Sequence, residues 1–352
     1  MLRIKVVFRT DGGPDIGMGH IMRCISLANE IKNSGHEVFF ICKMPEGANK
    51  ARESGFHTVV MDSDLGNSER SALGSEAVEE SNYVVSIIEN ANIDVFIVDS
   101  YQFDSSYFLA IKPHVKKLAY IDDLNRFEYP VDIVVNGNIT ADFIDTQAVS
   151  LDILLLMGVK YNLVRSEFRD IIKKRTKRKV SDIMITTGAS DPYDSAYGIV
   201  AALCKYTKFR EINLHIVVGG AFQNVDKLDK LQAANNNIIL HKNISSMSEI
   251  MILSDIAITA GGSTMYELCA CGTPSLVIIL SDVQIEITNK MCELGYMELL
   301  GRYDSISDEL LIHSVSNLCD DYERRCSVSE AMQKLVDGLG TLRVVKAIES
   351  IA

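Results

Sequence analysis

The sequence has little that would suggest an extracellular, membrane-bound or nucleic-acid-binding protein. No apolar run reaches membrane-spanning length, and the first residues lack the apolar core and cleavage site of a signal peptide. The eight cysteines include no Cys-x-x-Cys pair and fall mostly in apolar periodic segments, which predicts reduced core thiols. The formal net charge of -12 argues against a nucleic-acid partner, for which a basic face is expected. We therefore expect a soluble, cytoplasmic protein without membrane insertion.

Motifs of several large enzyme classes are also missing. The chain has no Walker motif, no nucleophile elbow around a serine and no His-Glu-x-x-His pair. The first Gly-x-Gly turn lacks the third glycine of the dinucleotide fingerprint, which argues against NAD. Residues with the spacing of metal ligands are absent too. We expect a metal-independent reaction that uses no cofactor.

Length and periodicity indicate two α/β domains. A chain of 352 residues is long for one core, and 47% apolar with 23% charged residues is typical of a globular protein. Apolar runs alternate with helical patterns, which is typical of doubly wound parallel sheets. We predict two Rossmann-like α/β domains, 1–160 and 181–352, that face each other across a cleft. A linker is expected at 161–180, and the last helix is expected to pack back on the first domain.

The predicted elements follow the same alternation in both halves. In the first half, strands are expected at 2–8, 37–42, 57–61, 95–98, 118–121 and 133–135. A polar loop at 63–75 and a helix through about residue 90 are expected between the third and fourth of these. In the second half, strands are expected at 183–185, 214–218, 238–241, 256–259 and 275–280. Helices are expected from there to the end.

The loop at residues 9–20 joins the first predicted strand to the first helix. It lies at the carboxyl end of a strand, where open α/β sheets bind ligands. Gly17 and Gly19 let the backbone approach a ligand, and the N–H groups of the helix start favour an anion such as a diphosphate. The helix dipole disfavours a charged ring at His20, which leaves a neutral imidazole able to accept a proton. A histidine at a helix start can also be a mere surface or capping residue.

A second candidate stretch covers residues 259–268 in the other half. Gly262 frees the backbone after a buried strand, and the hydroxyls of Ser263 and Thr264 can cap the next helix or donate to phosphate oxygens. Glu267 lies one turn into that helix, where a carboxylate can accept hydrogen bonds from the two hydroxyls of a ribose. An ordinary helix start with an acidic first turn explains the same pattern.

Other segments at strand ends have weaker patterns. Gly188 and Gly219 follow the first two strands of the second half, where either close approach of a nucleotide or a tight turn requires glycine. The basic run at 173–179 could bind nucleic acid, but a solvated linker is favoured in an acidic chain.

Taken together in order, these segments resemble the UDP-2,4-diacetamido-2,4,6-trideoxy-β-L-altropyranose hydrolases of pseudaminic acid biosynthesis. The resemblance covers nearly the whole chain. It is carried by Arg9-Thr10-Asp11, Ile16-Gly17-Met18-Gly19-His20, Arg23-Cys24, Asp99-Ser100-Tyr101, Ile121-Asp122-Asp123, Asn136-Gly137-Asn138, Tyr161, Arg165, Glu167-Phe168, 261–268, Asp337-Gly338-Leu339-Gly340 and Arg343.

This resemblance implies a fold, a reaction and a set of residues. The family has the glycosyltransferase-B (GT-B) architecture and is similar to the N-acetylglucosaminyltransferase of peptidoglycan synthesis. Its members attack the anomeric carbon and release UDP with inversion. The family's proposed base maps onto His20, and we expect Tyr101 or Asp11 to orient it or the water. The residues expected to bind substrate or UDP are Gly17, Gly19, Arg23, Asn138, Gly188, Gly219, Gly262, Ser263, Thr264, Tyr266, Glu267 and Gln284.

The chain departs from the family pattern at three places and leaves two other functions open. Ser100 stands where many relatives have histidine, Gly188-Ala189 replaces a Gly-Gly pair, and Val283-Gln284 replaces Asn-Gln. A GT-B glycosyltransferase would use an acceptor hydroxyl in place of water. A non-catalytic nucleotide-sugar-binding protein would bind UDP without releasing a product. Release of free UDP with and without an acceptor distinguishes the three.

Overall fold

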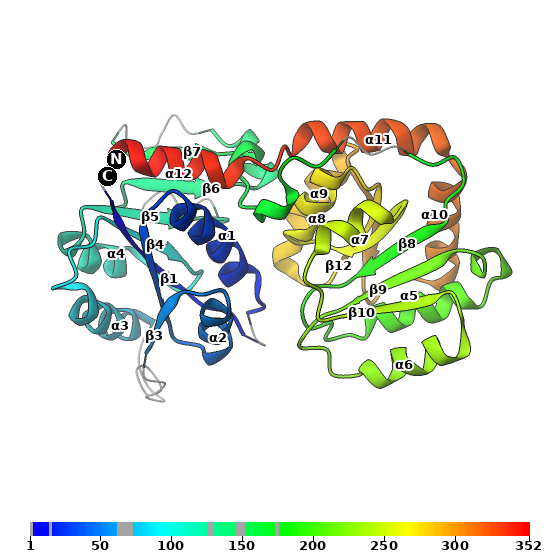
Figure 1. The fold of residues 1–352 in the computed structure, drawn as a ribbon, viewed down its shortest axis with the longest axis horizontal. Coiled ribbons are helices and arrows are strands. Elements are labelled where there is room, and N and C mark those ends of the chain that lie inside the picture. Colours follow the sequence, from blue (N-terminus) through cyan, green and yellow to red (C-terminus); the bar gives the residue numbers. More distant parts are fainter. Residues whose placement is uncertain (1–2, 14–15, 62–72, 125–129, 146–151, 173–175) are drawn as a thin grey trace. The chain divides into compact units, whose positions relative to one another are not determined.

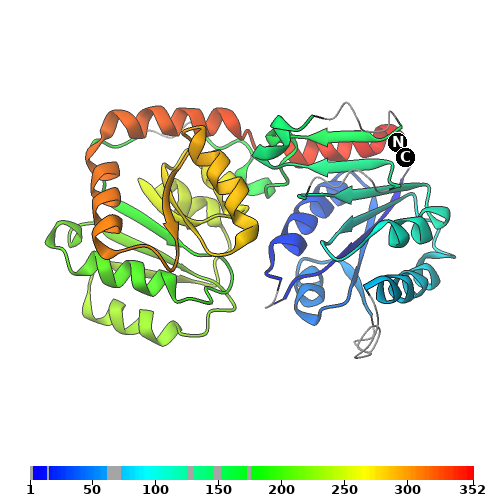
Figure 2. The ribbon, with the colours of Figure 1, turned by 180° about the vertical axis from the view of Figure 1, so that it is seen from behind.

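The chain forms two compact units, each described here by itself (Figures 1 and 2). The computed structural model describes residues 3–13, 16–61, 73–124, 130–145, 152–172 and 176–352. The first unit comprises residues up to Ser166 together with Leu339–Ala352, and the second comprises Glu167–Gly338.

The first unit contains a parallel sheet of seven strands in the order β3-β2-β1-β4-β5-β6-β7. The strands are β1 (Lys5–Thr10), β2 (Glu37–Cys42), β3 (His57–Val60), β4 (Val95–Asp99), β5 (Lys117–Ile121), β6 (Ile133–Asn136) and β7 (Leu154–Met157). Both faces of its central strands are buried, which explains their continuous apolar sequences.

Helices cover both faces of this sheet. They are α1 (Gly19–Asn33), α2 (Pro45–Glu53), α3 (Leu73–Ile88), α4 (Ser105–Ile111) and α12 (Gly340–Ile351). One core contains residues of α1, α2 and α12, and the core on the other face contains residues of α3 and α4. The last helix, coloured red in Figure 1, belongs to the first unit because Val344 and Ile348 are buried in that core.

The second unit contains a parallel sheet of six strands in the order β10-β9-β8-β11-β12-β13. Its strands are β8 (Asp182–Thr186), β9 (Asn213–Val218), β10 (Ile238–Lys242), β11 (Ile256–Ala260), β12 (Ser275–Ile279) and β13 (Glu298–Arg302). Its helices are α5 (Ser195–Cys204), α6 (Val225–Ala234), α7 (Met247–Leu253), α8 (Thr264–Cys271), α9 (Ile285–Glu293), α10 (Asp308–Asp320) and α11 (Tyr322–Leu335). The predicted fold class, α/β with two doubly wound parallel sheets, is thus confirmed.

All of the predicted strands are present, but the structure contains two more. No strand was predicted at β7, and β13 falls where only helices were expected. Both are edge strands of four or five residues, and Gly301 interrupts the pattern of β13 beside a register shift. The predicted loop at 63–75 falls mainly on 62–72, outside the described residues.

The segment predicted to be a linker, 161–180, is divided between the units. Leu163 belongs to the first core, and Phe168, which follows the boundary at Ser166, is fully buried. Lys177 pairs with Asp182 at 3.2 Å, so this part of the basic run is anchored to the second unit. Residues 173–175 of the run lie outside the described part of the chain.

Each sheet has one point at which the chain reverses its direction of travel across the sheet. In the first sheet it lies between β1 and β4, and in the second between β8 and β11. At such a switch point the two following connections leave on opposite faces, which opens a crevice at the carboxyl ends of the strands. These two edges are therefore the places to look for ligand sites.

A buried ion cluster stabilises the carboxyl end of β1. Arg9 is fully buried, and it donates through Nε to Glu80 at 2.8 Å and through Nη1 to Asp11. Asp11 also accepts the backbone N–H groups of Lys43 at 2.6 Å and Met44 at 2.9 Å. Burial alone would raise the pKa of Asp11, but Arg9 and these N–H groups lower it below its usual value.

The Asp11 cluster predicts acid lability of the first unit. Because the folded pKa of Asp11 is lowered, its stabilisation is complete above the unfolded pKa of about 3.9 and is lost as the pH falls below it. Asp11→Asn should lower the free energy of unfolding at pH 7 by about 3 kcal/mol and flatten its decline between pH 5 and 3. Urea unfolding, monitored by circular dichroism at each pH, measures the free energy of unfolding and its decline. The exposed Asp226→Asn is the control, and equal pH profiles for wild type and Asp11→Asn would contradict the account.

Two neighbouring glycines, Gly219 and Gly220, allow a test of close backbone packing in the second unit. A Cβ at Gly219 would collide with the carbonyl of Ala189, whereas a Cβ at Gly220 would meet nothing within 4 Å. Gly219→Ala should therefore destabilise the second unit by about 1–3 kcal/mol, and Gly220→Ala should stay within about 0.5 kcal/mol of wild type. Thermal unfolding of the two variants side by side checks this, and equal stability would rule out the close approach.

Candidate functional site

The first candidate site lies at the switch point of the first sheet, where α1 begins. Gly17 precedes α1 in a left-handed conformation, with φ of 74°, that favours glycine. In the described chain, no acceptor bonds the N–H groups of Gly19, His20 or Ile21 at the start of α1. A Cβ at Gly19 would meet no other atom within 4 Å. The helix start is therefore exposed and carries a partial positive charge, as the sequence predicts.

His20 is held by a carboxylate on the neighbouring strand. Its Nδ1 lies 2.7 Å from Oδ1 of Asp99, the last residue of β4. Because a carboxylate only accepts, Nδ1 carries the proton in this hydrogen bond, and Nε2 is left as the acceptor. The side chain of His20 is 11% exposed and that of Asp99 is fully buried. The imidazole can thus accept a proton from a ligand at the edge of the sheet.

Arg23 joins the dyad to a second carboxylate. It donates to both oxygens of Asp99, through Nε and Nη2, at 2.6 Å each. Its Nη1 donates to Oδ2 of Asp123 at 2.5 Å. Nη2 of Arg23 also lies 3.1 Å from Nδ1 of His20. Arg23 thus holds the two carboxylates together beside the imidazole, and its expected contact with the substrate or UDP stays a prediction.

Tyr101 and Asn138 complete the cluster from the loops after β4 and β6. The ring of Tyr101 stands edge to face against His20, with centroids 4.5 Å apart and an interplanar angle of 79°. Its hydroxyl donates to Oδ2 of Asp123 at 2.8 Å, and Nδ2 of Asn138 donates to Oδ1 at 2.7 Å. Asn138, predicted to bind substrate, is buried and contacts Asp123.

The pKa values of this cluster follow from burial and charge. Burial alone would raise the pKa of Asp99, but the charge of Arg23 and the contact with His20 lower it far below its usual value. Burial raises the pKa of Tyr101, and the neighbouring Asp123 raises it further. Asp99 is therefore ionised and Tyr101 protonated at neutral pH.

Asp11 was predicted, as the alternative to Tyr101, to orient His20 or the attacking water, but none of its described hydrogen bonds reaches His20. The carboxylate of Asp11 is bound by Arg9 and by the backbone of Lys43 and Met44. Asp99 holds the imidazole instead. In the sequence, Asp99 and Asp123 belong to motifs that carry the family resemblance, but no role was predicted for either. The available signal was their position, since each lies at or just beyond the carboxyl end of a buried strand.

The second candidate site lies at the switch point of the second sheet, where α8 begins. In the described chain, the N–H groups of Ser263 and Thr264 have no backbone acceptor. The hydroxyl of Ser263 makes no capping hydrogen bond, and the side chain is exposed. A Cβ at Gly262 would meet no other atom within 4 Å. Among the described residues of the second unit, no backbone carbonyl accepts these N–H groups, and a helix start of this kind favours an anion.

The remaining predicted residues of the second unit differ in their placement. Glu267 is half-buried in the first turn of α8, whereas Tyr266 is 2% exposed and packs in the core. Oε1 of Gln284 accepts the N–H of Leu280 at 2.9 Å. Gly188 lies at the end of β8 with a φ of 98°. The close approach of Gly219 to Ala189 gives it a packing role.

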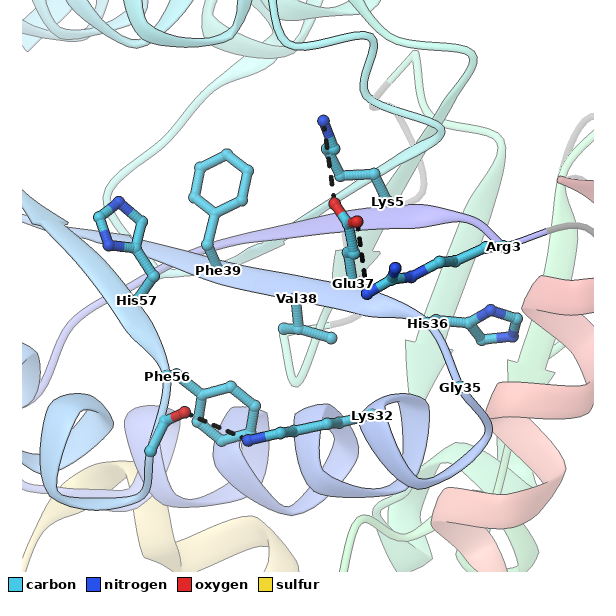
Figure 3. Close-up of a pocket in the computed structure, with 11 residues that line it drawn as sticks. Arg3, Lys5, Lys32, Gly35, His36, Glu37, Val38, Phe39, Phe56 and His57 are labelled. Atoms are coloured by element: carbon cyan, nitrogen blue, oxygen red, sulfur yellow. Dashed lines mark hydrogen bonds and ion pairs between the residues drawn. The ribbon is translucent and has the colours of Figure 1, made fainter.

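A pocket of about 530 Å³ opens at the amino ends of β1, β2 and β3, the opposite edge of the first sheet. Arg3 and Lys5 are already paired with Glu37 in this pocket, at 3.4 and 3.9 Å. Lys5, Phe39 and His57 lie on one face of the sheet, while Lys32 and Phe56 lie on the other (Figure 3). Lys32 already donates to the carbonyl of Gly55 at 3.2 Å. The pocket therefore does not form one binding site.

Across the described ranges, no three histidine, cysteine or acidic side chains come together as a metal site would require. None of the helices that the structure describes is both long and apolar enough to cross a membrane.

The comparison with known proteins connects the second unit to a family. Residues 183–337 match the glycosyltransferase family 28 C-terminal domain, and this range lies within the second unit. Among solved structures, MurG of Acinetobacter baumannii superimposes with a TM-score of 0.69 at 14% identity, covering 99% of both chains. CalG4, the calicheamicin glycosyltransferase, superimposes with a TM-score of 0.65 at 13% identity over 100% of this chain and 98% of that one. These likenesses and the two parallel-sheet units establish the GT-B architecture.

Three curated relatives extend the comparison in sequence. An uncharacterized protein of Methanocaldococcus jannaschii is 29% identical over 295 residues, which cover 80% of this chain but only 57% of that protein. The spore coat polysaccharide biosynthesis protein SpsG of Bacillus subtilis is 23% identical over 97% of this chain and 96% of its own length. The UDP-2,4-diacetamido-2,4,6-trideoxy-β-L-altropyranose hydrolase of Campylobacter jejuni is 26% identical over 75% of this chain and 87% of its own.

Proposed function

We propose that this protein hydrolyses the anomeric C–O bond of a UDP-sugar. The observation that carries the proposal is the His20–Asp99 pair, 2.7 Å apart, at the switch point of the first sheet. A partly exposed imidazole with a buried carboxylate on Nδ1 is the arrangement of a general base. The similarity to the Campylobacter jejuni hydrolase supports the same reaction and its substrate.

In the proposed reaction the second unit holds UDP and the first unit supplies the base. The start of α8 offers the N–H groups of Ser263 and Thr264 to the diphosphate, with Glu267 for the ribose. His20 removes a proton from water, whose oxygen attacks the anomeric carbon. The bond from that carbon to the β-phosphate oxygen breaks, and its electron pair leaves with UDP. The helix dipole stabilises the charge that builds up on the phosphate.

The sugar proposed for this site is 2,4-diacetamido-2,4,6-trideoxy-β-L-altrose, which is released with inversion. Support comes from the similarity to the Campylobacter jejuni hydrolase, which acts on this UDP-sugar, and from the motifs around His20 and Tyr101. UDP-N-acetylglucosamine serves as the comparison substrate in a test of this specificity.

A glycosyltransferase is the second candidate. It is favoured by the match of residues 183–337 to a glycosyltransferase family and by the likeness to MurG. In that reaction His20 would activate a hydroxyl of an acceptor in place of water. UDP release that depends on an added acceptor would identify the transferase, and UDP binding without any release would identify a binding protein.

His20→Ala should lower the rate of UDP release by about 10²-fold or more, because the general base is lost. UDP affinity, measured by calorimetry, should stay within about threefold of wild type, since the second unit binds UDP in this proposal. The exposed His114→Ala is the matched control and should behave as wild type. A His20→Ala protein with normal turnover would exclude the role of His20.

Asp99→Asn tests the orientation of the imidazole. The amide can donate to Nδ1 and so favour the tautomer that carries its proton on Nε2, which cannot act as a base. We expect kcat to fall by about 10²-fold with UDP affinity unchanged. Asp104→Asn, at the start of α4, is the control. Thermal unfolding of both variants verifies the fold, and an unchanged kcat in folded Asp99→Asn would refute the dyad.

A further inference from the structure

We propose that Asp123 is a positioning residue, which fixes the phenol of Tyr101 against the imidazole of His20. The inference rests on the proposed function and deepens it, since no comparison gives Asp123 a role. Asp123 lies just after β5, in the short connection at Asp122 and Asp123. It does not touch the proposed reacting atoms, so it would act through the ring of Tyr101.

The contacts of Asp123 come from three separate elements of the first unit. Arg23 reaches it from α1, Tyr101 from the loop after β4, and Asn138 from the loop after β6. Since β4, β5 and β6 are neighbours in the sheet, one carboxylate connects all three strand ends. The side chain is 12% exposed, so these hydrogen bonds form with little competition from water.

Charge balance alone does not explain Asp123. Arg23 already has a bidentate partner in Asp99, at 2.6 Å for both hydrogen bonds. A second carboxylate leaves the group with an excess negative charge, which a purely structural cluster would avoid. The additional contacts to Tyr101 and Asn138 distinguish Asp123 from a simple counterion.

The hydrogen bond to Asp123 determines what Tyr101 can do. Its hydroxyl donates to the carboxylate at 2.8 Å, so the phenolic proton is committed and the oxygen can only accept a further hydrogen bond. The raised pKa of Tyr101 agrees with a phenol that stays protonated. Tyr101 therefore restricts the position of the His20 ring and does not act as an acid. The two rings are in edge-to-face contact, with their centroids 4.5 Å apart.

The kinetic test compares Asp123→Asn, Tyr101→Phe and the double variant. Asparagine replaces one acceptor oxygen by a donor, so one of the three hydrogen bonds must fail. We expect Asp123→Asn to lower kcat by about 10-fold or more, with KM within about threefold. If Asp123 acts through the phenol, kcat of the double variant should lie within about twofold of kcat of the slower single variant. Losses that multiply would overturn the proposal.

The second readout does not depend on turnover. The carbon-bound ring protons of His20, assigned with His20→Ala, sense the ring current of Tyr101 in a 1H–13C spectrum. Asp123→Asn should shift these resonances, and the control Asp104→Asn should leave them in place. Unchanged His20 resonances in Asp123→Asn would overturn the positioning role, even in an active hydrolase. A wild-type protein that releases no UDP would refute the proposed function, while the spectrum would still test Asp123.

Tyr101→Phe tests the same hydrogen bond if Asp123→Asn does not fold. It breaks the same hydrogen bond but keeps the carboxylate of Asp123 and its ion pair with Arg23. It should lower kcat and shift the His20 resonances in the same direction as Asp123→Asn. A Tyr101→Phe protein that changes neither quantity would overturn the proposal.

Discussion

The bidentate ion pair between Arg23 and Asp99 is the interaction on which the candidate site of the first unit depends. Asp99 is fully buried and ionised, and a buried carboxylate needs both a cation and hydrogen-bond donors. Arg23 supplies the charge and two donors, and His20 supplies the third. The orientation of the imidazole therefore follows from the requirement to satisfy Asp99. Without that carboxylate, neither the tautomer nor the direction of Nε2 would be defined.

The sheet explains why these groups meet. Strands buried on both faces carry their polar side chains near their ends, so Asp99, the last residue of β4, and Asp123, just after β5, lie at the carboxyl edge of the sheet. The reversal of chain direction between β1 and β4 places the start of α1 beside the end of β4. His20 is the second residue of α1 and Asp99 the last of β4, so the dyad is built directly on two rigid elements. The second sheet has the same reversal between β8 and β11, where the N–H groups at the start of α8 have no backbone acceptor among the described residues and so favour an anion.

Sequence reasoning located the loops but not all of the partners. Runs of apolar residues and glycine-rich turns predicted the strands and the starts of α1 and α8, because these depend on local periodicity and backbone conformation. Whether Asp11 or Asp99 contacts His20 depends on the order of the strands, which no local pattern encodes. Arg23 was expected to bind the substrate or UDP on the basis of the family resemblance. Its actual partners are 76 and 100 positions away in the chain, at Asp99 and Asp123. The edge strands β7 and β13 escaped detection because they are short and only half-buried.

The most direct test of the account follows the oxygen atom of water. The UDP-sugar is incubated with the protein in water enriched in 18O, and both products are analysed by mass spectrometry before the free sugar exchanges its anomeric oxygen. If the water next to His20 attacks the anomeric carbon, the first-formed sugar carries the label and UDP carries none. Label in the phosphate of UDP would place the cleavage at the P–O bond. That result would contradict the assignment of His20 as the base for attack on the sugar.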